Sequence, residues 1–248
     1  MLKSYVAFDL ETTGLSVEEN CIIEFGALKV RDGAVADRFM TFVKPEEEIT
    51  ERITEITGIT NAMTEDAPPI EEVMKAFVDF CGDDVLIGHN LLFDFSFAKK
   101  YAGRCGYPFE KKGIDTLKIA RTVCTGVVSK SLGSLCDYYG IVNDQAHRAY
   151  HDALATAKLY QTLAHYYENG HEALFAPSPL IYKEKKVQPA TPKQKAYLKE
   201  LIKYHKIDFN EDMDAMTRSQ MSKAIDKIIL NHGLPARRRE SRNDFAEG

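Results

Sequence analysis

Two carboxylates interrupt a short apolar segment near the start of the chain, which has the residue pattern of a buried β-strand. Residues 5–11 read Tyr-Val-Ala-Phe-Asp-Leu-Glu, so Asp9 and Glu11 alternate with apolar side chains. Because side chains two positions apart leave the same face of a strand, both acids are expected on one face of a sheet. An unpaired carboxylate is costly to bury. A bound cation is the least costly compensation for such burial.

Two further acids, Asp94 and Asp152, lie in phase with apolar helical stripes. Each begins a series of apolar residues at helical spacing: Phe97, Ala98 and Tyr101 after Asp94, and Ala155, Leu159 and Leu163 after Asp152. Residues so spaced share one face of a helix, so each acid is expected to point into the interior. Helix capping or a satisfied buried acid explains any one of the acids alone. Four together favour a divalent cation held by oxygen ligands, and thus phosphate chemistry.

His147 precedes Asp152 by five residues. In one continuous helix this spacing would place the two side chains about 140° apart around the axis. A histidine in a loop just before the helix can instead lean over the same site. A neutral imidazole, with an ordinary pKa of about 6.5, is able to take a proton from water. The alternative is an ordinary surface histidine, and the neighbouring His151 is expected to be a bystander.

The pattern over residues 1–170 predicts an α/β domain with a mixed, five-stranded sheet flanked by helices. An antiparallel meander is followed by alternating helices and strands. The expected strands are 4–11, 22–30, 37–43, 85–88 and 115–119. The expected helices are 70–80, 91–103, 131–139 and 149–168.

The chain of 248 residues has room for this domain and a small second one. Prolines and charged residues predict a linker at 171–190, a small helical module at 191–233 and a basic, disordered tail at 234–248. Thr191 and Thr217 are expected to cap the two helices of the module. Residues 1–182 carry 17 basic and 27 acidic side chains, whereas residues 183–248 carry 15 and 10. The second part is therefore better suited to approach a polyanion, although a solvated, lysine-rich surface explains the same charge.

Composition excludes several classes of protein. An apolar segment of about 20 residues, the length of a membrane span, is absent from the sequence. The five cysteines are dispersed and odd in number, which argues against a disulfide framework or a zinc knuckle. The first residues run directly into a strand, so a signal peptide is not expected. We expect a protein of the reducing cytoplasm, without a membrane partner.

Three ordered motifs resemble those of the DEDD family of exonucleases. They are Phe-Asp-Leu-Glu-Thr-Thr-Gly-Leu at 8–15, Gly-His-Asn-Leu-Leu-Phe-Asp at 88–94 and His-Arg-Ala-Tyr-His-Asp-Ala-Leu-Ala-Thr at 147–156. A histidine five residues before the last aspartate marks the subgroup with a histidine base. This family includes the proofreading epsilon subunit of bacterial DNA polymerase III and ribonuclease T. The resemblance covers about residues 1–168.

The resemblance implies a ribonuclease H-like fold and hydrolysis from a 3′ end with two divalent cations, Mg²⁺ or Mn²⁺. Asp9, Glu11 and Asp152 would hold the cation that activates water. Asp9, with Asp94 acting through a second layer of contacts, would hold the cation at the leaving oxygen. His147 would deprotonate the water.

The resemblance also places six residues around the terminal nucleotide: Thr12, Thr13, Leu15, His89, Asn90 and Phe93. Leu15 would wedge against the base, while Phe93 is equally well explained as a core residue. Proofreading members often carry histidine where this chain has Thr57, so one substrate contact is in doubt. Stacking and apolar wedging tolerate any base, so little sequence specificity is expected.

These observations favour a metal-dependent 3′–5′ exonuclease that acts on single-stranded DNA, in proofreading or repair. The first alternative is an exoribonuclease of the same family that trims RNA 3′ ends. The second is a non-catalytic nucleic-acid-binding or polymerase-docking protein, against which the complete set of acids and His147 argues. Residues 191–248 are the expected contact for a polymerase or another replication or repair partner.

Overall fold

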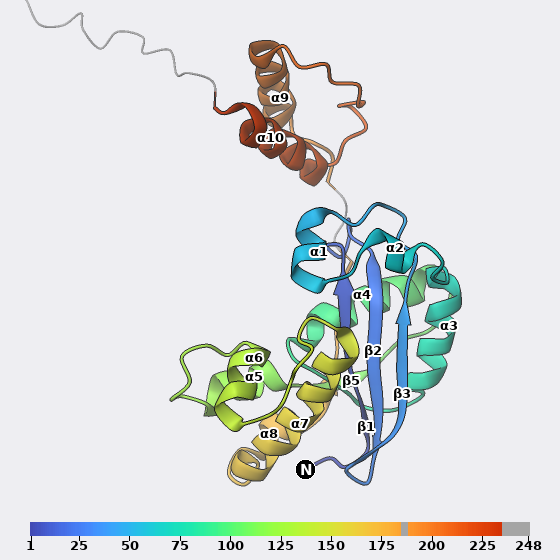
Figure 1. The fold of residues 1–248 in the computed structure, drawn as a ribbon. Coiled ribbons are helices and arrows are strands. Elements are labelled where there is room, and N and C mark those ends of the chain that lie inside the picture. Colours follow the sequence, from blue (N-terminus) through green and yellow to red (C-terminus); the bar gives the residue numbers. More distant parts are fainter. Residues whose placement is uncertain (185–187, 235–248) are drawn as a thin grey trace, which may run out of the picture. The chain divides into compact units, whose positions relative to one another are not determined.

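The computed structural model describes residues 1–184 and 188–234. The chain divides into two compact units, Met1–Glu184 and Lys185–Gly248. The first holds the sheet and most of the helices, and the second holds two helices (Figure 1).

A six-stranded mixed sheet forms the centre of the first unit, in the order β3-β2-β1-β4-β5-β6. Strands β1 (Tyr5–Thr12), β2 (Ile22–Arg31) and β3 (Ala34–Phe42) form an antiparallel meander. The short strands β4 (Leu86–Gly88) and β5 (Lys112–Asp115) run parallel to β1, and β6 (Ser178–Pro179) pairs antiparallel with β5. The predicted mixed α/β fold is thus confirmed, with one more strand than expected.

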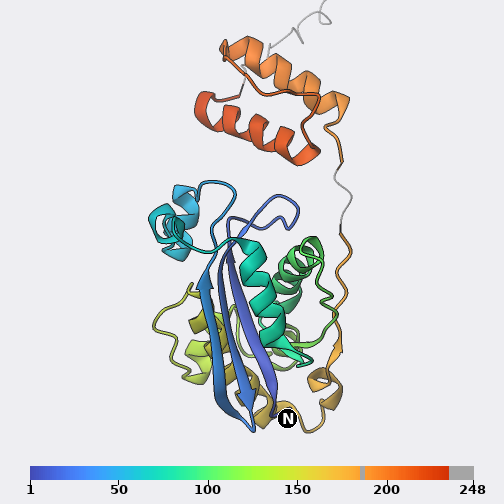
Figure 2. The same ribbon diagram turned by 90° about the vertical axis from the view of Figure 1, so that its right-hand side faces the viewer.

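Helices cover both faces of the sheet (Figures 1 and 2). Even-numbered β1 residues such as Val6 and Phe8 pack with α3 (Ile70–Cys81) and α4 (Leu91–Arg104). Odd-numbered residues such as Tyr5 and Ala7 pack with α5 (Thr116–Val123), α6 (Leu132–Tyr139) and α7 (Ala149–Tyr167). Asp9 and Glu11 continue the odd-numbered row, so the alternation seen in the sequence puts them on the α7 face.

Three short helices were not expected from the sequence: α1 (Glu51–Thr57), α2 (Asn61–Thr64) and α8 (Glu172–Phe175). The fifth strand, predicted near 115–119, lies three residues earlier as β5, and α5 occupies most of the predicted range. Asp115 ends β5 and its side chain accepts a hydrogen bond from the Leu117 N–H at 2.9 Å, which caps the helix. An aspartate that caps a helix so soon after a strand leaves no room for more strand.

The expected linker at 171–190 belongs in part to the first unit. Phe175 of α8 is buried, and β6 pairs with Lys112 and Gly113 of β5. The first unit therefore extends to Glu184.

The second unit contains α9 (Pro192–His205) and α10 (Arg218–His232). Thr191 and Thr217 cap them as predicted, each in a capping box with a glutamine three residues later. Its small core contains seven buried apolar residues: Ala190, Leu198, Leu201, Met216, Met221, Ile225 and Ile228. The expected disordered tail at 234–248 falls, apart from Leu234, outside the described residues. Over those residues, no helix combines the length and apolarity needed to span a membrane.

Candidate active site

The two acids of β1 lie where that strand extends beyond its parallel neighbour. The three-residue strand β4 pairs only with Val6 and Ala7 of β1. Asp9 and Glu11 therefore lie past the carboxyl end of β4. In open α/β sheets, crevices at the carboxyl ends of strands are the usual ligand sites.

Asp94, in the first turn of α4, contacts the part of β1 that extends beyond β4. Its Oδ1 accepts a hydrogen bond from the Leu10 N–H at 3.0 Å. This amide lies between the two acids of β1, and β4 is too short to pair with it. Asp94 is buried together with Phe97, Ala98 and Tyr101, as its helical phase predicted.

Asp152 and His147 meet at the start of α7. The backbone N–H of His147 donates to Asp152 Oδ2 at 2.8 Å, and Asn143 Nδ2 donates to Asp152 Oδ1 at 2.7 Å. His147 lies in the loop before the helix with φ of 65°, a left-handed conformation that turns the loop back over the first helical turn. Because Asp152 lies in that turn, the partial positive charge of the helix N-terminus also stabilises its carboxylate.

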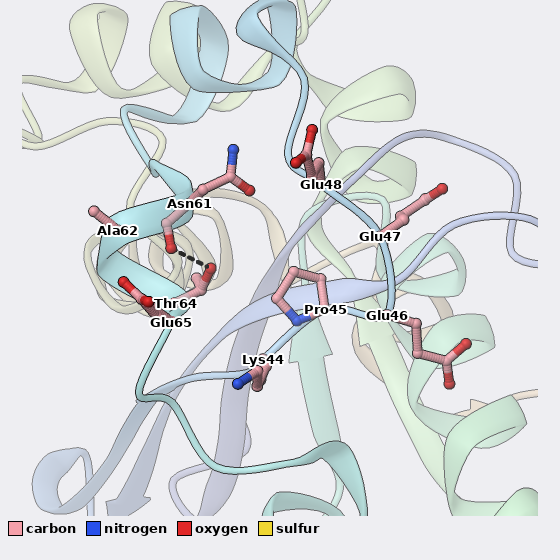
Figure 3. Close-up of a pocket in the computed structure, with 9 residues that line it drawn as sticks. All are labelled: Lys44, Pro45, Glu46, Glu47, Glu48, Asn61, Ala62, Thr64 and Glu65. Atoms are coloured by element: carbon pink, nitrogen blue, oxygen red, sulfur yellow. Dashed lines mark hydrogen bonds between the residues drawn. The ribbon is translucent and has the colours of Figure 1, made fainter.

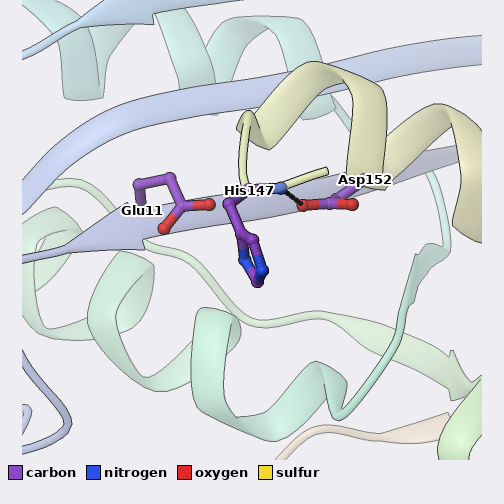
Figure 4. A group of neighbouring side chains, drawn as sticks. All are labelled: Glu11, His147 and Asp152. Carbon is purple, nitrogen blue, oxygen red and sulfur yellow. Dashed lines mark hydrogen bonds between the residues drawn. The ribbon is translucent and has the colours of Figure 1, made fainter. Parts of the chain in front are cut away.

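Three of these side chains converge on one point. Ligand atoms of Glu11, His147 and Asp152 all lie within 4.8 Å of one another (Figure 4). Asp152 is buried, Glu11 half-buried and His147 exposed, so the group opens to solvent on the His147 side. Asp9 and Asp94 lie beside this group. Residues from three distant segments therefore form one cluster of acids with a histidine at its rim.

The electrostatics of the cluster are those of crowded anions. Burial, and then the charge of Asp94, raise the pKa of Asp9 well above its usual range, and Glu11 and Asp152 add to the effect. Burial is also the main cause that raises the pKa of Asp94, against the hydrogen bond from Leu10. The pKa of Glu11 is raised to about 8, by burial first and then by the charge of Asp152. The cluster thus lacks enough neighbouring positive charge to keep all of its acids ionised.

A divalent cation fits this shortage. Glu11 and Asp152 offer carboxylate oxygens close enough together to share one ion, and oxygen is the ligand that Mg²⁺ and Mn²⁺ prefer. A bound cation would favour the ionised forms of the acids that crowding now opposes. The residues present therefore suit a divalent metal site.

The strand β2 and the start of α7 are joined directly behind the cluster. The buried carboxylate of Glu24 accepts hydrogen bonds from Arg148 Nη2 at 2.8 Å and from the Ala149 N–H at 3.1 Å. Glu24 lies opposite Glu11 in the β1–β2 register. At Gly26, a Cβ atom would lie 1.9 Å from the Tyr150 nitrogen, so only glycine permits this approach. These contacts fix the backbone directly after His147.

Comparison with known proteins identifies the family. The exonuclease family model named RNase_T matches residues 6–160, which contain every acid described above and His147. The chain belongs to this exonuclease family. The resemblance inferred from the three motifs is therefore confirmed.

The curated relatives that match this exonuclease domain include DNA polymerases III of the PolC type. The PolC-type DNA polymerase III of Caldanaerobacter subterraneus subsp. tengcongensis is 40% identical over 156 residues, which are 63% of this chain and 11% of that protein. The PolC-type enzyme of Staphylococcus haemolyticus is 41% identical over 158 residues, again 63% and 11%. The chain thus matches only about a tenth of the length of these relatives.

Solved exonucleases share the fold. Exonuclease X in complex with 5′ overhanging duplex DNA superposes with a TM-score of 0.53 at 27% identity, covering 65% of this chain and 92% of that one. Exonuclease I superposes with a TM-score of 0.64 at 18% identity, covering 70% and 43%. Exonuclease I supports the fold alone.

The turn after β1 carries three of the residues expected at the terminal nucleotide of an exonuclease substrate. Thr12 is buried and its hydroxyl donates to the Gly14 carbonyl at 2.8 Å. The Thr13 hydroxyl accepts from the Cys21 N–H at 2.9 Å, which closes the turn. Leu15 is 86% exposed, as a residue available to wedge against a base would be.

The other three expected contacts follow β4. Both ring nitrogens of His89 already have protein partners, Thr116 Oγ1 and the Lys130 carbonyl, each at 2.9 Å. A substrate contact by His89 would thus use the face or the carbon edge of its ring. Asn90 has φ of 66° and its N–H donates to Asp115 Oδ1, which leaves the exposed side chain available. Phe93 is half-buried against Phe97, so it serves the core at least in part.

Thr57, the position where proofreading exonucleases often carry histidine, is turned inward. It is buried at the end of α1, and its hydroxyl donates to the Ile53 carbonyl and accepts from the Ile59 N–H. In this chain the residue stabilises the end of a short helix.

A surface hollow next to the exonuclease site is acidic (Figure 3). Its charged lining consists of one lysine and four glutamates: Lys44, Glu46, Glu47, Glu48 and Glu65. Glu47 accepts a hydrogen bond from the Thr13 hydroxyl at 3.1 Å, so the hollow lies beside the turn that follows β1. Because four carboxylates repel a polyanion, we do not assign a nucleic-acid strand to this hollow.

Sequence reasoning missed Glu24, Gly26, Asn143 and Arg148. A signal existed for Glu24, which interrupts the apolar segment at 22–30 as Asp9 interrupts the first strand. The sequence offered no comparable signal for Asn143, which lies in a polar loop.

Proposed function

We propose that this chain is a metal-dependent 3′–5′ exonuclease that hydrolyses single-stranded DNA. The observation that carries the proposal is the convergence of Glu11, His147 and Asp152 within 4.8 Å, with Asp9 and Asp94 beside them. Burial and mutual repulsion raise the pKa values of these acids. A role in stabilising the fold would not require such a cluster. A metal-dependent hydrolytic centre does require one, because the acids hold the cations on which its function depends.

The residues divide the chemistry between them. Asp9, Glu11 and Asp152 would hold one cation, and Asp9 a second, with Asp94 as its support. When bound, the cations would activate water and stabilise the charge on the leaving 3′ oxygen. His147 takes the proton of the attacking water, because its exposed ring adjoins the acids while harder oxygen ligands suit Mg²⁺ or Mn²⁺ better.

The turn at 12–15 would hold the terminal nucleotide. The exposed Leu15 offers an apolar contact to any base, and the closed turn at Thr13 fixes where that contact lies. Asn90, Phe93 and the ring of His89 would line the other side. Such contacts predict little preference among the bases.

Relatives favour DNA over RNA as the substrate. Exonuclease X, 27% identical to this chain, is known in complex with duplex DNA, and the PolC-type relatives are DNA polymerases. A place in replication or repair follows from the same relatives, with residues 191–248 as the candidate contact for a polymerase. An exoribonuclease remains the alternative within the family.

One assay tests the proposal. The protein is incubated with 3′- and 5′-labelled single-stranded DNA and RNA, with Mg²⁺, with Mn²⁺ and with a chelator. We expect stepwise loss of nucleotides from the 3′ end of DNA that needs metal and disappears in Asp9→Asn. Glu65→Gln, which removes an exposed acid from the hollow of Figure 3, should behave as wild type.

Four outcomes would change the conclusion. Metal-independent cleavage, or an Asp9→Asn protein as active as wild type, would refute the mechanism. Faster trimming of RNA than of DNA would establish the alternative substrate. Nucleic-acid binding without hydrolysis under any metal would support the non-catalytic alternative.

A further inference from the structure

The second unit separates its charges between two segments. Helix α9 and its C-cap carry five lysines and one glutamate over residues 192–206. The following segment, 207–216, carries four acids and no basic residue. The family match ends at residue 160, so the family model covers neither segment.

The basic residues of α9 that face outward lie on one side of the helix. Leu198 and Leu201 are buried and fix the inner face. Lys193, Lys199 and Lys203 are exposed on the other side. Lys195 differs, since its Nζ donates to Asp214 Oδ1 at 2.7 Å and holds the acidic segment against the helix.

Two tyrosines lie among these lysines. Tyr197 and Tyr204 are seven residues apart, which is two turns or about 10 Å of helix, so they share one side. Tyr197 and Tyr204 are 36% and 52% exposed. The small core of the second unit does not bury these rings. Glu200 is the one acid in the same stripe.

Aromatic rings interleaved with cations match the chemistry of a single nucleic-acid strand. Bases stack on exposed rings, and the phosphates between them attract lysines. A membrane-surface helix inserts an apolar face, and the apolar face of α9 is already buried in the core of the second unit. An acidic peptide would satisfy the lysines but would not call for exposed aromatic rings beside them.

We propose that the outward face of α9, formed by Lys193, Tyr197, Lys199, Lys203 and Tyr204, binds single-stranded nucleic acid. The proposal rests on the proposed function for the identity of its ligand, the strand that the first unit shortens. It adds a second binding surface, in a part of the chain outside the family match. Such a surface would retain the strand while the 3′ end is released.

Binding is measured on the full chain with Asp9→Asn and chelator present, so that the strand is not degraded. The probe is a fluorescently labelled oligothymidylate of about 20 nucleotides, longer than one site for a single strand. In the double variant Tyr197→Ala/Tyr204→Ala we expect affinity to fall about tenfold or more, since stacking contributes strongly for each base. Tyr138→Ala removes an exposed tyrosine from the first unit, with 60% of its surface accessible, and should not change the affinity.

Salt dependence provides a second readout. Lys199→Gln/Lys203→Gln should reduce the slope of log affinity against log salt by about 1.4, because each phosphate contact with a single strand contributes about 0.7. Lys227→Gln, an exposed lysine of α10, is the control and should leave the slope unchanged. Because these side chains are exposed, circular dichroism of each variant should match the parent.

The outcomes separate this inference from the proposed function. Equal affinity and equal slope in parent and α9 variants would overturn the inference and leave a solvated lysine-rich helix. Equal losses in the control variants would overturn it as well, since the effect would then not be specific to the face of α9. Hydrolysis of a dinucleotide by the unsubstituted chain reports on the proposed function alone.

Discussion

Arg148 holds the buried carboxylate of Glu24 through two guanidinium nitrogens. Nη2 donates to Oε1 at 2.8 Å, and Nε lies 3.2 and 3.3 Å from the two carboxylate oxygens. Glu24 and Arg148 are 124 positions apart in the sequence, and Arg148 directly follows His147. The pair therefore ties the end of the His147 loop to the sheet, although neither side chain belongs to the cluster of Glu11, His147 and Asp152.

Replacing Glu24 should reduce turnover more than substrate binding. Glu24→Gln removes the charge that Arg148 and the Ala149 N–H neutralise, which loosens the start of α7. We expect kcat to fall about 10- to 100-fold with little change in KM, as for other residues that orient metal ligands. Steady-state kinetics on a labelled oligonucleotide measure both constants, and Arg148→Lys should show an intermediate loss because it keeps charge but not the paired geometry. A rise in KM with unchanged kcat would instead make Glu24 a substrate contact.

Gly26 should tolerate no side chain. In Gly26→Ala the new Cβ would lie 1.9 Å from the Tyr150 nitrogen and 2.0 Å from the Ala149 carbonyl carbon, both backbone atoms. Helix α7 would have to move away from β2, so we expect a loss of about 3 kcal/mol or more in the free energy of unfolding, above the usual cost of overpacking. Chemical denaturation measures this loss.

Gly103→Ala is the matched control. Gly103 lies in α4, where an added Cβ meets no atom of the described residues within 4 Å. Alanine there should stabilise the protein by about 0.5–1 kcal/mol through its higher helix propensity. Equal effects of the two substitutions would show that the β2–α7 approach does not limit the fold.

The acids of the site could be predicted because their periodicity is local. Asp9 and Glu11 follow the alternation of one strand, and Asp94 and Asp152 follow single helical stripes. The exposed loop position of His147 followed from the same local reasoning. Their convergence could be inferred only through the family resemblance, since no spacing rule connects segments so far apart.

Contacts between distant segments account for what the sequence did not predict. The Glu24–Arg148 pair depends on how α7 crosses β2, which sequence periodicity does not specify. The boundary between β5 and α5 depends on Asp115, whose side chain accepts from both Leu117 and Asn90. The residues after Gly170 looked like linker because prolines and charges dominate there, yet the burial of Phe175 holds them on the first unit.

The metal-free protein should lose stability as pH rises. Folding raises the pKa of Glu11 from 4.5 to about 8 and also raises the pKa values of Asp9 and Asp94. A raised pKa means that the folded state binds the proton more tightly, so this contribution is complete below pH 4.5 and is lost as pH rises to about 8. We expect the Tm in chelator to fall over this interval, and Mg²⁺ or Mn²⁺ to raise it more at pH 8 than at pH 6.

Glu11→Gln is the control for that experiment, because it removes the group whose pKa is raised to about 8, the upper end of this interval. Its Tm in chelator should depend less on pH than that of wild type, and metal should stabilise it less. A wild-type Tm that rises with pH throughout the interval would contradict the account of the site as a cluster short of positive charge.

His147 should be needed for proton transfer and not for metal binding. His147→Asn removes the imidazole, while asparagine tolerates the left-handed backbone with φ of 65° and keeps the N–H that Asp152 accepts from. We expect a loss of about 10²- to 10⁴-fold in kcat, the usual contribution of a general base.

The metal dependence of the same variant decides between the two roles open to a histidine at this position. If His147 acts as a base, the metal concentration for half-maximal activity should stay close to the wild-type value. A large increase would assign His147 to metal binding, together with Glu11 and Asp152. His151→Gln changes a neighbouring, half-buried histidine and should leave both quantities unchanged. A kcat loss in His151→Gln equal to that in His147→Asn would instead show that any disturbance of the first turn of α7 impairs the site.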